Sequence, residues 1–133
     1  MILLDTHALI WWVGRSPELP AGVLHEIERH AKKGMLAVSS MSFWEIAMLF
    51  KSGRLRLLFD LDTWVDKVVS IPNLEIIPPD HAILIQSVLL PEPFHKDPAD
   101  RIIVASAMKR GATVMTRDEK IRRYPHVRTF WEG

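Results

Sequence analysis

Short apolar runs alternate with longer segments of helical pattern along almost the whole chain. The runs have the length of buried strands. They occur at residues 2–4, 35–38, 74–77, 112–115 and 127–131. Strands that are apolar throughout and separated by helices favour a parallel sheet covered on both faces. The sequence therefore predicts the α/β fold class.

The segments between these runs begin and end with residues typical of helix termini. The segment 97–110 is the clearest, because Asp97 can cap it, Pro98 suits its first turn and Gly111 can end it. Further helices are expected at residues 7–12, 21–33, 39–51, 61–70, 79–89 and 117–123.

Length and composition limit what such a chain can be. Its 133 residues fit one domain, which we expect to span residues 1–133. A net charge of +1 gives no strong overall attraction to nucleic acid, so any such attraction must be local. The absence of cysteine excludes disulfides, thiolate catalysis and cysteine-bound zinc. No apolar run is long enough to cross a bilayer, and the first residues lack a signal-peptide pattern, so we expect a cytoplasmic protein.

Acidic side chains follow the ends of the expected strands. Asp5 comes directly after the first strand, and Asp118 follows the fourth. Asp97 and Asp100 open the helix that leads into the fourth strand, and Glu45 lies one turn into the helix after the second. Open α/β sheets bind ligands outside the carboxyl ends of their strands. We therefore expect these acids to meet at one edge of the sheet.

Each of these acids also suits a helix N-terminus, where carboxylates accept hydrogen bonds from free backbone N–H groups. Residues 42–45 match a capping box, and for Glu45 alone this interpretation is as good as a catalytic one. Asp118 fits both interpretations equally, whereas capping is favoured for Asp97. Function is favoured for Asp5, because an acid directly after a buried run costs desolvation energy.

Taken together, the acids indicate a metal centre. Four or five carboxylates at one sheet edge repel one another unless cations lie between them. Oxygen ligands suit Mg²⁺ or Mn²⁺, and zinc is disfavoured because the chain has neither cysteine nor a paired-histidine motif. Such a centre can activate water for attack on a phosphodiester. Hydrolysis of nucleic acid is the expected chemistry.

Four motifs carry a family resemblance. They read LDTHAL at residues 4–9, SFWEIA at 42–47, DPADR at 97–101 and TRD at 116–118. Together, and over essentially the whole chain, they resemble the PIN-domain family, and within it the VapC-type toxins of type II bacterial toxin-antitoxin pairs. The resemblance implies a three-layer α/β/α sandwich with a central parallel sheet, RNA cleavage that depends on Mg²⁺ or Mn²⁺, and a protein antitoxin that masks the site.

The resemblance also implies a role for each acid that matches the motifs. Asp5 and Asp100 match the firmest metal ligands. Glu45 matches a ligand or a base that orients water, and Asp118 a ligand of one metal. Asp97 is an extra acid, which we assign to helix capping with an indirect supporting role.

Polar neighbours of the acids have supporting roles in this hypothesis. Thr6 and Thr116 are expected to support the acids, with Thr116 ordering them by hydrogen bonds. Arg101 and Arg117 adjoin the acids in sequence, and each either contacts RNA phosphate or neutralises a neighbouring carboxylate.

Other residues near the motifs have weaker functional interpretations. The basic stretch at 51–56 fits solvated surface charge better than a guide for RNA. Trp11 and Trp12 cannot both face inward, so one is expected at a dimer or antitoxin surface, and we expect a homodimer. His7 and His95 fit surface histidines better than catalytic ones.

Three other functions fit parts of the sequence. An RNA-processing nuclease without an antitoxin shares all four motifs, and a neighbouring antitoxin gene would separate the two functions. A receiver domain has a similar length and also binds Mg²⁺, but it requires paired acids after the first strand, where this chain has Asp5 alone. A non-catalytic binding module would have no metal affinity, and the intact acid set disfavours it.

Overall fold

A five-stranded parallel sheet forms the centre of the computed structural model, which describes residues 1–132. The strands are β1 (Ile2–Leu4), β2 (Leu36–Ser39), β3 (Leu74–Ile77), β4 (Thr113–Met115) and β5 (Thr129–Phe130). They lie in the order β3-β2-β1-β4-β5, and every neighbouring pair is parallel. The parallel sheet predicted from the apolar runs is confirmed.

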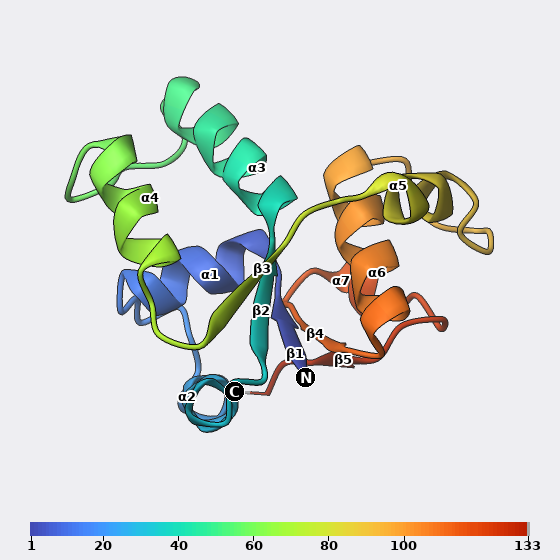
Figure 1. Ribbon diagram of the computed structural model, residues 1–133, viewed down its shortest axis with the longest axis horizontal. Helices are drawn as coiled ribbons and strands as arrows, with labels where there is room; N and C mark the ends of the chain where they lie inside the picture. The colour runs from blue at the N-terminus through green and yellow to red at the C-terminus, as the bar shows by residue number, and fades with distance from the viewer. Residues whose placement is uncertain (133) are drawn as a thin grey trace.

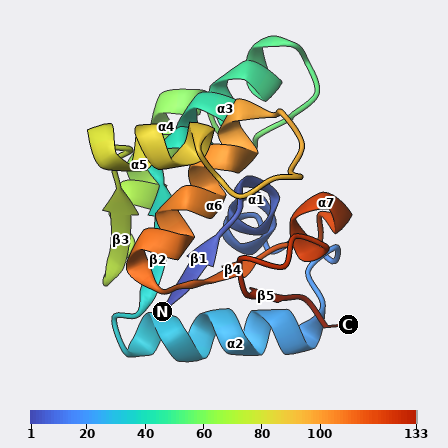
Figure 2. The same ribbon diagram turned by 90° about the vertical axis from the view of Figure 1, so that its right-hand side faces the viewer.

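Helices cover both faces of this sheet (Figure 1). One face carries α1 (Thr6–Val13), α2 (Ala21–Lys32), α3 (Ser40–Lys51) and α4 (Leu61–Val69). The other carries α5 (His81–Val88), α6 (Pro98–Arg110) and α7 (Glu119–Arg122). Figure 2 shows α2 running along the end of the sheet at which β1 begins. The three-layer α/β/α sandwich is confirmed.

Alternate residues of the central strands belong to two separate hydrophobic cores. Leu3 of β1 packs on the side of α5 and α6, whereas Ile2 and Leu4 pack on the side of α1 to α4. Leu3 and Leu4 are fully buried. Burial on both faces explains why the strands are apolar at every position rather than at every second one. Each such leucine contributes roughly 1.5–3 kcal/mol to folding.

The clearest predicted helix, α6, has the expected ends. The Asp97 side chain accepts a hydrogen bond from the backbone N–H of Asp100, Pro98 occupies the first turn, and Gly111 adopts a left-handed conformation with φ of 62°. Among the described residues, no helix combines the length and the apolar character that a membrane crossing requires.

The start of α3 agrees with the predicted helix at residues 39–51, but its cap is not the one that the capping-box pattern of residues 42–45 indicated. Ser39 is the N-cap, and its hydroxyl accepts a hydrogen bond from the backbone N–H of Met41 at 3.0 Å. The helix therefore begins at Ser40, directly after β2, and Ser42 lies inside its first turn. The capping box predicted for residues 42–45 is wrong, because Ser39 already occupies the capping position. Glu45 thus has no capping role at the start of α3.

Candidate metal centre

The predicted acids meet at the carboxyl edge of the sheet, between β1 and β4. From β1 the chain continues to β2 and β3 on one side, whereas β4 and β5 extend the sheet on the other. Such a reversal of strand order opens a crevice at the carboxyl ends of the strands. A cavity of about 420 Å³ lies there. Its lining consists of Asp5, Thr6, His7, Trp11, Glu45, His95, Asp97, Asp100, Arg117, Asp118 and Lys120.

Asp5 is both a helix cap and a member of this cavity. Its Oδ1 accepts a hydrogen bond from the backbone N–H of Ala8 at 2.9 Å, and its Oδ2 accepts one from the hydroxyl of Thr116. The side chain is almost buried. Burial raises the pKa of Asp5 above its ordinary value, although these two hydrogen bonds oppose the rise. The capping and functional interpretations of Asp5 are therefore compatible.

Glu45 reaches the cavity from the second turn of α3. The hydroxyl of Thr6 donates a hydrogen bond to Glu45 Oε1 and lies 3.0 Å from Ser42 Oγ. A serine hydroxyl at that distance can donate to Thr6 in turn. Burial is the largest cause of a raised pKa at Glu45, and the charges of Asp97 and Asp5 raise it further. Thr6 thus orients one of the acids.

Asp97 and Asp100 bring two carboxylates from the first turn of α6. Glu45, Asp97 and Asp100 each offer one oxygen, and these three atoms lie within 4.8 Å of one another. Burial, followed by the charges of Asp97 and Glu45 and then of Asp118 and Asp5, raises the pKa of Asp100 to about 8. Asp97 therefore caps its helix, as expected, and also lies within the acidic cluster.

Asp118 lies in the loop after β4 and lines the same cavity. Its Oδ1 accepts a hydrogen bond from the backbone N–H of Lys120 at 2.8 Å, so it caps α7. Its own backbone N–H donates to Thr116 Oγ1 at 3.0 Å. Because the same Thr116 hydroxyl donates to Asp5, this threonine connects the two acids, and the hydrogen bonding predicted for it is observed.

The two arginines of the motifs do not pair with the acidic cluster. All five N–H donors of Arg101 have acceptors elsewhere, namely the carbonyl oxygens of Ser87, Val88, Phe94 and His95 and the carboxylate of Glu92. Arg101 therefore neutralises the carboxylate of Glu92 rather than an acid of the cavity, and its contact with RNA phosphate stays a prediction for which these contacts leave no free donor.

Arg117 lies at the rim of the cavity. Its Nη1 donates to Glu18 at 2.9 Å, and its guanidinium lies over the Trp11 ring at 4.5 Å from the ring centre. Its salt-bridge partner is thus a distant glutamate rather than the neighbouring Asp118. About half of the Arg117 side chain is exposed, so an incoming anion can still reach it.

His95 and Lys120 also line the cavity, although sequence reasoning gave neither a site role. His95 Nε2 lies 3.1 Å from Asp100 Oδ2. The signal for His95 was its place two residues before Asp97, and that for Lys120 was its place two residues after Asp118. His7 lines the same cavity beside Trp11, with ring centres 5.5 Å apart.

The donor set of the cavity fits a hard divalent cation. Its carboxylates supply oxygen ligands, and the chain has no cysteine to favour softer metals. The N-termini of α1 and α6 face the cavity, because their caps Asp5 and Asp97 line it. The partial positive charge of these helix N-termini offsets only part of the repulsion among the carboxylates, because the pKa of Asp100 is still raised. A cation would relieve the remainder.

Comparison with known proteins agrees with this geometry. The family model of the PIN domain matches residues 2–127. The chain belongs to the PIN-domain family. This PIN-domain protein is 33% identical to "Ribonuclease VapC22" of Mycobacterium tuberculosis over 132 residues, which cover 98% of each chain. The family predicted from the four motifs is confirmed.

Solved structures share the fold of this PIN-domain protein. One is VapBC2 from Rickettsia felis bound to a DNA fragment from their promoter, with a TM-score of 0.72, 21% identity, and coverage of 99% of this chain and 100% of that one. Another is FitAcB from Neisseria gonorrhoeae, with a TM-score of 0.67, 22% identity, and coverage of 98% and 96%. At this level of identity the likeness establishes the PIN fold alone.

Proposed function

We propose that this PIN-domain protein is an RNA endonuclease that depends on Mg²⁺ or Mn²⁺. The observation that carries the proposal is the cluster of carboxylates, from buried Asp5 through half-buried Glu45 and Asp100 to exposed Asp97 and Asp118, in which the pKa of Asp100 rises to about 8. Such a cluster is stable only when protonated or when a cation is present. The similarity to a protein named as a ribonuclease supports RNA as the substrate.

In this proposal Asp5, Glu45, Asp100 and Asp118 hold the ion, and Asp97 adds a further negative charge beside Glu45 and Asp100. When bound, Mg²⁺ or Mn²⁺ supplies positive charge that strengthens water as a nucleophile and stabilises the phosphodiester transition state. The chain itself orients the acids through the hydroxyls of Thr6 and Thr116. This preorganisation lowers the cost of arranging the ligands when the ion binds.

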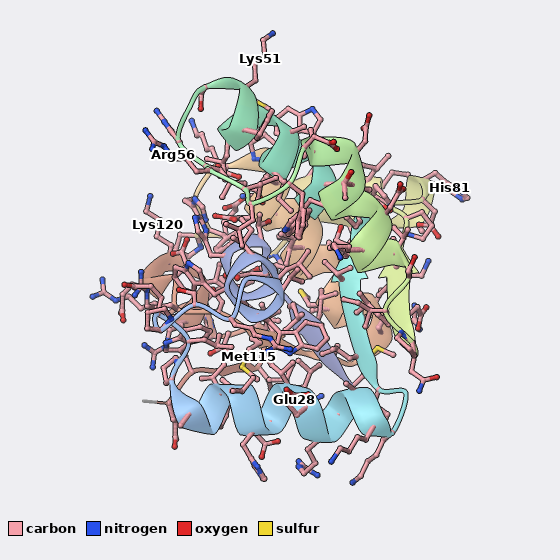
Figure 3. The ribbon with its side chains drawn as sticks, turned by 90° about the vertical axis from the view of Figure 1, so that its left-hand side faces the viewer. Glu28, Lys51, Arg56, His81, Met115 and Lys120 are labelled. Carbon is pink, nitrogen blue, oxygen red and sulfur yellow. The ribbon has the colours of Figure 1, made fainter. Side chains whose placement is uncertain are left out.

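Basic side chains around the acids can bind phosphates that flank the cleaved bond. Arg117 and Lys120 line one side of the cavity, and Arg54 lines a second hollow that shares Glu45 and Asp97 with it. Figure 3 shows Arg56 and Lys120 projecting from the same side of the molecule, with Lys51 at the tip of α3. An RNA backbone crossing the cavity would meet cations before and after the acidic centre.

The same proposal makes the chain a cytoplasmic, single-domain toxin, residues 1–133, that a protein antitoxin neutralises. Structural neighbours described as toxin-antitoxin and VapBC complexes support this partner. The homodimer expected from the sequence stays a prediction. Exposed apolar residues of α5 and the residue after it support a second copy there, namely Leu84, Ile85, Val88 and Leu89.

Cleavage of a labelled RNA pool tests the nuclease. We expect the purified protein to cut with Mg²⁺ or Mn²⁺ and to stop with chelator, and we expect Asp5→Asn and Asp100→Asn to be inactive while their far-UV circular dichroism is unchanged. Asp66→Asn, which changes an exposed aspartate of α4, is the matched control and should cut like wild type. Cleavage that survives chelation, or none with either metal, would contradict the proposal.

A further inference from the structure

Side chains of Arg101 and Tyr124 hold the end of α5 and the loop between α5 and α6 by hydrogen bonds to backbone carbonyl oxygens. The guanidinium of Arg101 donates to the carbonyl oxygens of Ser87 at 2.7 Å, of Phe94 at 3.1 Å and of His95 at 3.1 Å. On the far side of the loop, the hydroxyl of Tyr124 donates to the carbonyl oxygen of Pro91 at 2.7 Å. We call these contacts the Arg101 clamp. The clamp fixes the backbone at His95.

The aromatic rings of the loop fix the side chain of His95 as well. The ring of Phe94 meets the His95 ring edge to face at 4.6 Å and packs on the Tyr124 ring at 4.4 Å. Ring contacts of this kind favour one arrangement over others by about 0.5–1.5 kcal/mol each. The imidazole of His95 is therefore held in one orientation, directed into the cavity that it lines.

That orientation brings the imidazole to one of the acids. His95 Nε2 is buried, lies 3.1 Å from Asp100 Oδ2, and has no hydrogen-bond partner of good geometry among the described residues. A buried ring nitrogen requires a partner, and Asp100 presents one within reach. An N–H donated from Nε2 would engage one oxygen of Asp100 and leave the other free for a cation.

We propose that His95 is a positioning residue of the metal centre: held by the Arg101 clamp, its imidazole orients the carboxylate of Asp100 for the divalent ion. The proposal rests on the metal-dependent function proposed above. It explains why Arg101, adjacent to Asp100 in sequence, spends all five of its donors on the last residues of α5 and the loop after them. Arg101 acts on Asp100 indirectly, through the position of His95.

Titration with Mn²⁺, followed by its electron paramagnetic resonance signal, tests the role of His95 without using activity. We expect His95→Leu to bind Mn²⁺ about 10–100-fold more weakly than wild type, the range found when a partner of a metal ligand is removed. His95→Gln, which can place an amide N–H near the position of Nε2, should restore most of the affinity. His126→Leu, which changes an exposed histidine on the other side of Tyr124, is the matched control and should bind like wild type.

A double-mutant cycle tests the clamp. Arg101→Lys should weaken Mn²⁺ binding, and combining it with His95→Leu should add little further loss, because both changes remove the same orientation. Arg110→Lys, at an arginine paired with Glu75 on the surface, controls for the substitution itself. Additive losses from Arg101→Lys and His95→Leu would overturn the clamp as the support of His95.

The possible outcomes separate this proposal from the function on which it rests. If wild type neither binds Mn²⁺ nor cleaves RNA, the proposed function fails and the positioning role fails with it. If wild type does both and His95→Leu binds Mn²⁺ equally well, the positioning role alone is overturned. Unchanged affinity with a reduced kcat would instead place His95 at the substrate, which also overturns a positioning role.

Discussion

Replacing Asp100 by asparagine should stabilise the metal-free protein, and increasingly so as the pH rises. The pKa of Asp100 rises from its ordinary value of 3.8 to about 8, chiefly through burial and then through the neighbouring carboxylates. Between these values the folded chain keeps a proton that the unfolded chain has released, so the free energy of unfolding falls as the pH increases. An asparagine has no proton to lose and escapes this penalty.

The expected size of the effect follows from the same shift. Each pH unit between the two pKa values costs at most about 1.4 kcal/mol, so raising the pH from about 5.5 to about 7.5 costs at most about 2.7 kcal/mol. The Asp100 side chain is 18% exposed, and solvent screening reduces this bound. We therefore expect Asp100→Asn to gain about 1–2 kcal/mol over wild type across this interval.

Urea unfolding in chelator at the two pH values measures this gain, with Asp66→Asn as the control for loss of an exposed carboxylate. Adding Mn²⁺ at the higher pH should reverse the order, because the ion stabilises only the protein that binds it. A stability difference between Asp100→Asn and wild type that does not change with pH would refute the argument that the cluster strains the metal-free fold.

Substitutions at four further positions test three parts of the site and the expected dimer surface. Asp97→Asn should keep the cap of α6, since asparagine caps as well as aspartate, but it should weaken Mn²⁺ binding in the paramagnetic resonance titration. An unchanged Mn²⁺ affinity would mean that Asp97 caps the helix and does nothing for the metal centre. Thr116→Val should lower Mn²⁺ affinity about 10–100-fold with unchanged circular dichroism, and Thr116→Ser should restore the affinity. If Thr116→Val binds Mn²⁺ as tightly as wild type, the Thr116 hydroxyl does not support the metal centre. Arg117→Gln should reduce the salt dependence of RNA binding, measured by fluorescence anisotropy in chelator, by about one unit of slope; an unchanged slope would mean that Arg117 contacts no phosphate. Val88→Glu should convert a dimer to a monomer in light scattering, and a wild type that is already monomeric would contradict the dimer.

The sequence was sufficient to predict the sheet and the position of the acids. Both follow from short-range rules, since buried strands are apolar throughout and parallel strands share a carboxyl edge. Asp5 and Asp118 could therefore be assigned to one edge although 113 positions separate them, because each directly follows or closely follows a predicted strand. The same local logic identified Asp97 as the cap of α6.

The partners of side chains could not be predicted in this way. Arg101 adjoins Asp100 in sequence, yet its donors face the end of α5 and a loop that Tyr124, far along the chain, also contacts. Ser42 looked like a helix cap because its spacing to Glu45 is right, but the Ser39 hydroxyl accepts the backbone N–H of Met41 and so caps α3. Such choices depend on competition between side chains in three dimensions, which spacing alone does not encode.

The pairing of β1 with β4 sets the moment at which the acidic cavity can assemble. Ile2 aligns with Thr113, so residues from both ends of the described chain must come together before the acids face each other. A chain still being synthesised that ends before Thr113 lacks Thr116 and Asp118, and its Asp5 has no hydroxyl partner. If the protein cleaves RNA, it cannot do so from a partly made chain. The order of the strands thus delays assembly of the acidic cavity until the residues of β4 and the loop after it have been synthesised.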